Sequence, residues 1–197
     1  LARSELLDAQ TRQRLVAECS ERILGRLTQE AERLVIREDS PLATDWLNGR
    51  RNPYPAPGLA GTVTGLRLST SAPEIYYAFA EATAFATKAI LDHLAANGVV
   101  IEKLTGIGGI SQKSPFVMQL LADVTGRKIS VIDCKQACAM GSVVYASIIA
   151  GRYGSVEEAE RALCNFPARV YAPAAERYPL LMQRYERYKA LGQTRQR

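Results

Sequence analysis

Three closely spaced glycines are the residues of this 197-residue chain whose pattern best fits ligand chemistry. Gly106, Gly108 and Gly109 interrupt the end of a short segment, 103–107, which we predict to be a half-buried β-strand. Because glycine has no Cβ, the backbone of such a turn can lie directly against a sugar or a phosphate. Lys113 follows four residues later, and its charge is within reach of a phosphate or the edge of a nucleotide.

The spacing of these residues leaves two interpretations open. The segment contains neither the GxxxxGK[ST] pattern of a phosphate-binding loop nor the GxGxxG pattern of a dinucleotide site. Ser114-Pro115 is typical of a helix start, whose free amides favour anions, and open α/β sheets bind ligands at the carboxyl ends of their strands. A tight turn that only joins a strand to a helix would use the same glycines.

The elements that must hold this turn alternate between helices and strands. Apolar periodicity, caps and glycine stops predict helices over 5–35, 71–97, 115–125, 136–150, 155–164 and 174–191, and strands over 62–68, 103–107 and 128–133. Alternation of this kind is typical of a parallel or mixed sheet covered by helices. The predicted fold class is therefore α/β and helix-rich.

The predicted strands are too few for the apolar helices around them. Three strands make a thin sheet, and the helix over 136–150 is apolar nearly all round, which is typical of a helix inside a protein. We therefore expect an incomplete mixed sheet, completed by absent chain or by another copy, and a homo-oligomer. Glu81, inside the alanine-rich helix over 71–97, is expected to have a polar partner.

The composition excludes several classes of protein. With 47% hydrophobic residues, the chain is not mainly disordered. It contains no apolar run of membrane-spanning length and no secretory signal at the N-terminus, so we expect no membrane partner and a cytoplasmic location. Four cysteines without a CxxC motif and a single histidine argue against a structural zinc site.

A net charge of +5 requires nucleic acid to be considered as a partner. Basic residues and tyrosines alternate over 178–197, and aromatic rings between cations can bind single strands. The favoured interpretation is instead a C-terminal helix with a solvated basic face and tyrosines lying on the protein. We therefore expect no nucleic-acid partner.

Several blocks of the sequence resemble the C-terminal domain of the FGGY carbohydrate kinases. They are GIGGISQKSPFVMQLLADVTGRKISV at 106–131, QACAMGSVVYASIIAG at 136–151, DWLNGRRNP at 45–53, SAPEIYYAFAEATAFATKAI at 71–90, and YAPAAERYPLLMQRYERYKALG at 171–192. The blocks keep their order and spacing over residues 40–192. The resemblance is strongest to the branch that phosphorylates L-ribulose in arabinose catabolism, and another pentulose such as xylulose is the alternative substrate.

The resemblance implies the C-terminal part of an actin-like, ribonuclease-H-like domain in an ATP-dependent, magnesium-using sugar kinase. Gly108 and Gly109 match the family's adenosine motif, and Lys113 matches a position on the adenine and ribose side. Cys138 and Gly141 match a helix that packs behind that site. The implied partners are ATP, a pentulose sugar and the N-terminal domain that this chain lacks.

The same resemblance implies that catalytic parts lie outside this sequence. The first domain of the family, with its phosphate loop and catalytic aspartate, has no counterpart here, and no aspartate of this chain matches that motif. We therefore assign no catalytic or metal-binding residue and expect the isolated chain to be inactive. A non-catalytic self-association module remains an alternative.

The expected division of the chain is an N-terminal long helix at 1–37, a Pro/Gly-rich loop with a short strand at 38–70, the nucleotide-side kinase core at 71–192 and a tail at 193–197.

Overall fold

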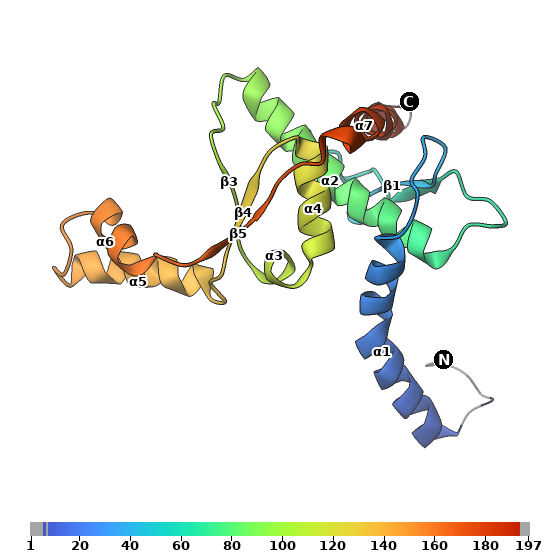
Figure 1. Ribbon diagram of the computed structural model, residues 1–197, viewed down its shortest axis with the longest axis horizontal. Coiled ribbons are helices and arrows are strands. Elements are labelled where there is room, and N and C mark those ends of the chain that lie inside the picture. The colour runs from blue at the N-terminus through green and yellow to red at the C-terminus, as the bar shows by residue number, and fades with distance from the viewer. Residues whose placement is uncertain (1–5, 7, 194–197) are drawn as a thin grey trace. The chain divides into compact units, whose positions relative to one another are not determined.

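The computed structural model describes Leu6 and residues 8–193 (Figure 1). Its helices are α1 (Ala9–Ala31), α2 (Ala72–Ala96), α3 (Gly109–Lys113), α4 (Pro115–Thr125), α5 (Ala137–Ile149), α6 (Val156–Leu163), the 3-10 turn η1 (Ala175–Arg177) and α7 (Tyr178–Gln193). Its strands are β1 (Leu42–Thr44), β2 (Thr62–Thr64), β3 (Leu104–Gly106), β4 (Ile129–Ile132) and β5 (Ala168–Tyr171). None of the helices within the described residues is long and apolar enough to cross a membrane.

The chain forms two compact units, and α2 and α7 each continue from one into the other. One unit contains residues up to Thr83 and from Gln183 onward, and the other contains Ala84–Met182. The first unit holds an antiparallel pair, β1 and β2, with Leu42 opposite Thr64. The second holds a three-stranded mixed sheet in the order β3-β4-β5.

The prediction of at most three strands is wrong, because β1 and β5 were missed. Each has only three or four residues, and β1 lies in the Pro/Gly-rich stretch that we predicted to be a loop. The predicted strand over 62–68 is shorter, at 62–64, and pairs with β1 rather than with the main sheet. A strand this short acquires its identity from its partner, which local sequence does not reveal.

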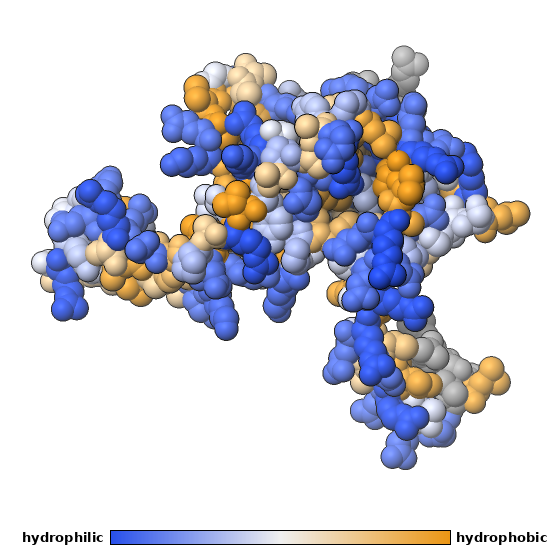
Figure 2. All heavy atoms as spheres, in the orientation of Figure 1, coloured by the Kyte–Doolittle hydropathy of each residue, from blue (hydrophilic) through white to orange (hydrophobic). Residues whose placement is uncertain are grey.

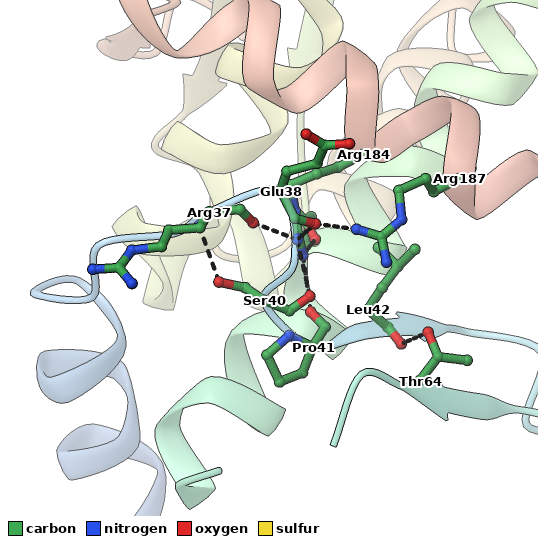
Figure 3. Close-up of polar contacts among 9 residues, drawn as sticks. Arg37, Glu38, Ser40, Pro41, Leu42, Thr64, Arg184 and Arg187 are labelled. Carbon is green, nitrogen blue, oxygen red and sulfur yellow. Dashed lines mark hydrogen bonds and ion pairs between the residues drawn. The ribbon is translucent and has the colours of Figure 1, made fainter. Parts of the chain in front are cut away.

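The first unit is organised around a buried arginine, Arg184 on α7 (Figure 3). Its guanidinium donates to both carboxylate oxygens of Glu81 on α2, at 2.8 and 2.6 Å. It also donates to four backbone oxygens of the segment before β1, those of Arg37, Glu38, Ser40 and Pro41. Both charged side chains are fully buried, and the expectation that Glu81 has a partner is confirmed.

Two of the three tyrosines of α7 lie against the protein, as predicted, whereas Tyr178 is 37% exposed. Tyr185 and Tyr188 are buried, and the Tyr188 hydroxyl donates to Asp45 at 2.9 Å. Trp46, also buried, lies 5.5 Å from Tyr188 between ring centroids and so anchors its loop. The predicted solvated basic face is wrong at one position, because Arg184 is fully buried.

The second unit has its core where α4 packs on the sheet. The cluster contains Met118, Ala122, Ile129, Val131 and Tyr171. The local signals predicted α4 correctly: Ser114 accepts from the Val117 amide, proline occupies the first turn, and Gly126 ends the helix in the left-handed conformation. In Figure 1, α4 runs beside β4 and β5.

Helix α5 departs from its prediction. We expected a helix apolar nearly all round to lie inside the protein, but Val144 is the one residue of α5 that is buried. Val143, Tyr145 and Ile149 are 48%, 62% and 88% exposed. Figure 2 shows orange, hydrophobic atoms along α5 beside the bluer atoms of α6. The apolar surface of α5 is therefore largely uncovered in this chain.

Candidate functional site

The glycine turn lies at the carboxyl ends of two parallel strands. β3 pairs with β4 in register, Leu104 opposite Ile129 and Gly106 opposite Val131, so both strands end at the same edge of the sheet. A Cβ on Gly106 would stand 3.0 Å from the Met118 side chain and 3.2 Å from that of Val131. Gly106 is therefore required for packing, in contrast to the two glycines that follow it.

Gly108 and Gly109 form an exposed turn with free space around it. Gly108 has φ +91° and ψ −178°, a conformation that L side chains rarely adopt, and a Cβ there would meet nothing within 4 Å. Gly109 has no positive φ, and its Cβ would also meet nothing within 4 Å. The backbone at both positions is therefore open to a ligand. At Gly109 a side chain would be excluded only by a bound ligand, because neither backbone strain nor a neighbouring atom opposes it.

Side chains of α3 fix the turn to the ends of the strands. The Ser111 hydroxyl donates to the Gly108 carbonyl at 2.8 Å, and the Gln112 amide donates to the carbonyl of Ile132, the last residue of β4. Ser111 is buried, so its hydroxyl is shielded from water that would compete for this bond. The turn is consequently held in one place rather than hanging free. Helix α3, between the turn and α4, was not predicted.

A hollow of about 520 Å³ opens beside the turn. Its volume lies in the usual range for small-molecule sites, about 300–1,000 Å³. The strands end in its wall, and α5 and α6 supply most of the rest. Its lining residues are Ile107, Ile132, Cys134, Ala137, Met140, Gly141, Val144, Tyr145, Val156, Glu160, Arg161, Cys164 and Phe166. An apolar wall of this kind suits a flat ring such as a nucleotide base.

None of the three predicted site residues lines the hollow itself. Gly108 and Gly109 are adjacent to Ile107, where the hollow begins. Lys113, the last residue of α3, is exposed and is not among the residues that line the hollow. Its flexible side chain extends from the same short helix that starts at the turn.

Two positions that we predicted to pack behind the site do not pack in this chain. Cys138 is exposed on the first turn of α5. Gly141 has nothing within 4 Å of a built Cβ and lines the hollow itself. Both belong to the helix whose apolar surface this chain leaves uncovered.

Sequence reasoning missed the contribution of α6. Glu160, Arg161 and Cys164 reach the hollow because α6 packs on α5 and because β5 returns the chain to the sheet, Ala168 opposite Ile132. Since β5 was not predicted, nothing in the sequence placed α6 next to the glycine turn. Its cap, Ser155 accepting from the Glu158 amide, was the one readable signal.

The buried aspartate of this unit is committed to structure. Asp123 on α4 accepts from Arg177 at 2.6 Å, from the Ala174 amide at 2.9 Å and from the Gln119 amide at 2.8 Å. These bonds tie the segment between β5 and α7 to α4. The chain itself supplies these three donors to the buried Asp123, which therefore has a structural role.

Comparison with known proteins identifies relatives of this chain. The model of the FGGY family of carbohydrate kinases, C-terminal domain, matches residues 3–150. A ribulokinase of Vibrio parahaemolyticus is 41% identical over 176 residues, which are 89% of this chain and 31% of the relative. A ribulokinase of Bacillus licheniformis is 39% identical over 169 residues, 84% of this chain and 31% of the relative. The chain thus spans about a third of the length of these curated relatives.

Solved structures agree on the fold. The crystal structure of xylulose kinase from Rhodospirillum rubrum superposes with a TM-score of 0.77 at 21% identity, over 91% of this chain and 36% of that one. The predicted fold class, a helix-rich C-terminal part of an actin-like α/β domain with an incomplete mixed sheet, is thereby confirmed. From the matched family model and the relatives together, the chain belongs to the FGGY family of carbohydrate kinases, as part of its C-terminal domain.

Proposed function

We propose that this chain is the nucleotide-binding part of an ATP-dependent kinase that phosphorylates L-ribulose. Identities of 41% and 39% to proteins named ribulokinase support the substrate. The xylulose kinase at 21% identity supports the fold alone, so xylulose is the weaker alternative. In the whole enzyme, the terminal hydroxyl of the sugar attacks the γ-phosphorus of ATP, and ADP leaves.

The observation that carries this proposal is the open glycine turn beside an apolar hollow at the carboxyl ends of β3 and β4. The nucleoside would lie there, with ribose against the backbone of Gly108 and Gly109 and the base between the apolar walls. Lys113 would lie on the outer side of the nucleoside, where its charge favours phosphate. The contribution of this chain to phosphoryl transfer is then positioning of the donor.

Magnesium and the catalytic base would come from outside these residues. Within the described residues, no group of three or more acidic, histidine or cysteine side chains could hold a metal ion. Magnesium would therefore arrive on the phosphates of ATP, where it neutralises their charge. The proton acceptor for the sugar hydroxyl would belong to the N-terminal domain, and we propose a cytoplasmic homo-oligomer as the working form.

Nucleotide binding to the chain tests this proposal by titration calorimetry with ATP. The sharpest variant is Gly109→Val, since its side chain enters space that is empty in the structure without backbone strain. We expect it to lower ATP affinity at least tenfold while the melting temperature stays within two or three degrees. Gly58→Val is the matched control, because Gly58 also has nothing within 4 Å of a Cβ but lies in the other unit.

Two results would contradict the proposal. One is ATP affinity that survives Gly109→Val. The other is phosphorylation of L-ribulose by this chain alone in a coupled ADP-release assay, because turnover would require a proton acceptor that we place elsewhere.

A further inference from the structure

Helix α1 makes little contact with the other described residues of its unit. Of its 23 residues, Ala31 at the C-terminal end is the one that is buried. The Thr28 hydroxyl lies 3.0 Å from the Tyr76 hydroxyl of α2, so this contact is also close to the C-terminal end. In Figure 1, α1 extends from that end away from β1 and from the start of α2. The greater part of the helix therefore has a surface that another molecule can cover.

One face of α1 carries side chains at alternating spacings of four and three residues, which is typical of a helix that pairs with another helix. We name this face the α1 seam, and its members are Arg12, Val16, Cys19, Ile23, Arg26 and Glu30. Cys19 is exposed and Ile23 is 53% exposed, so the apolar middle of the seam is open to solvent. Thr28 lies about 140° around the helix from Ile23, so its contact with α2 does not cover the seam.

The charges of the α1 seam determine which orientation of a second α1 helix it fits. Arg12 and Glu30, at opposite ends of the seam, are equally distant from residue 21. In an antiparallel pair with its two-fold axis at that residue, Arg12 of each copy faces Glu30 of the other. A parallel pair would instead set arginine against arginine and glutamate against glutamate, and like charges in contact are unfavourable. Glu30 accepts from Arg26 of its own helix at 2.7 Å and is 42% exposed, and a carboxylate can accept from a second arginine as well.

The apolar residues of α1 have the same symmetry. Cys19 and Ile23 are equally distant from residue 21, and so are Leu15 and Leu27, which flank the seam. A two-fold interface requires such reciprocity, because each residue of one copy must fit the residue that faces it from the other copy. With the axis at residue 21, leucine faces leucine and Cys19 faces Ile23. The charges and the apolar residues therefore select the same antiparallel register.

We infer that α1 is the interaction surface for a second copy of this chain, and that the two α1 seams pair antiparallel about residue 21. This inference deepens the homo-oligomer of the proposed function by naming its surface, and it does not depend on the nucleotide site. From Arg12 to Glu30 the seam is about 27 Å long, at 1.5 Å per residue. Its apolar middle is short, so the dimer forms reversibly, at micromolar concentrations of protein.

Sedimentation equilibrium without nucleotide tests the surface. We expect the wild-type chain to be mainly dimeric at about 100 µM and to dissociate on dilution. Ile23→Glu places a carboxylate in the middle of the seam and should weaken the dimer at least tenfold. The matched control is Ala17→Glu, which adds the same charge at an exposed position about 120° around the same helix. It should change the dissociation constant less than about threefold, and circular dichroism should show the same helix content in all three proteins.

Charge reversal tests the orientation. In the antiparallel pair, Arg12→Glu or Glu30→Arg alone sets like charges opposite each other twice in each dimer, and each should weaken association about tenfold. The double variant Arg12→Glu/Glu30→Arg restores opposite charges and should return the dissociation constant to within about threefold of the wild-type value. These differences should shrink at 1 M salt, where exposed charges are screened.

Three outcomes would overturn the inference. They are a wild-type chain that stays monomeric at about 100 µM, equal association of Ile23→Glu and Ala17→Glu, and a double reversal that associates no better than the single ones. The proposed nucleotide site is tested separately, because ATP titration of the monomeric Ile23→Glu variant reports on that site alone. Loss of ATP binding in both the wild type and Ile23→Glu would contradict the nucleotide site, while the sedimentation results would still decide the role of α1.

Discussion

Arg184 in one unit and Glu160 in the other are both charged side chains, but Arg184 is buried and Glu160 is exposed. Arg184 is fully buried, and Glu81 with four backbone carbonyls satisfies its donors. Glu160 lies at an open hollow, and its carboxylate has no partner among the described residues. Burying an unpaired charge is very costly, so a side chain that stays unpaired must stay near water or meet a ligand.

This difference distinguishes polar groups that stabilise the fold from polar groups that are available to a ligand. Among the described residues, every buried side-chain nitrogen or oxygen has a hydrogen-bond partner. Glu160 and the glycine turn are exposed, so water satisfies their polar groups until a ligand replaces it. The hydrogen bonds of Arg184 stabilise the fold, whereas the exposed polar groups beside the hollow are available to a ligand.

The largest expected effect comes from removing the buried ion pair of Arg184 and Glu81. Arg184→Met should lower the free energy of unfolding by about 3–5 kcal/mol, because Glu81 would remain buried without its charge partner. Denaturant titration followed by circular dichroism measures this loss. The control is Arg187→Met on the same helix, a half-buried residue whose guanidinium donates to the Glu38 carbonyl. Its cost should be about 1 kcal/mol or less. Equal losses in the two variants would refute the special role of Arg184.

A smaller effect tests how much of helix α5 is exposed to solvent. Val143 and Val144 are neighbours on α5, but Val144 is 3% exposed and Val143 48%. Val144→Ala should cost about 2 kcal/mol of unfolding free energy, and Val143→Ala less than about 0.5 kcal/mol. If Val143→Ala costs as much as Val144→Ala and both costs depend on protein concentration, a second copy covers α5 in solution.

The smallest effect concerns a carboxylate of intermediate burial, Asp45. Burial raises its pKa above the usual 3.8, and the hydrogen bond from Tyr188 only partly opposes this. Between 3.8 and the raised pKa, the folded state binds more protons than the unfolded state. Stability therefore falls as the pH rises through this window.

Asp45→Asn removes that proton uptake, while its amide oxygen still accepts from Tyr188. The melting temperature of the variant should therefore gain on that of the wild type as the pH rises from 3.5 to about 6. Thermal melts of both proteins across this range measure the difference. A constant difference, or one that shrinks with rising pH, would contradict the raised pKa of Asp45.

Much of the candidate site could be predicted from the sequence because its signals are local. The strand before Gly106, the cap at Ser114 and the stop at Gly126 depend on residues within four positions of one another. The FGGY resemblance added the adenosine motif at Gly108 and Gly109. The hollow could not be predicted in the same way, since its wall needs α6, and α6 is placed by the pairing of β5 with β4.

The sequence by itself determined the longer helices, where the glycine turn lies and which family the chain resembles, because caps, periodicity and motifs act over short distances. Only the tertiary structure decided that Arg184 pairs with a glutamate 103 residues earlier in the chain. It also decided that short strands pair, that α5 stays uncovered and that Glu160 faces the hollow. Those features depend on contacts between segments far apart in the chain, whose formation requires the whole set of packed elements.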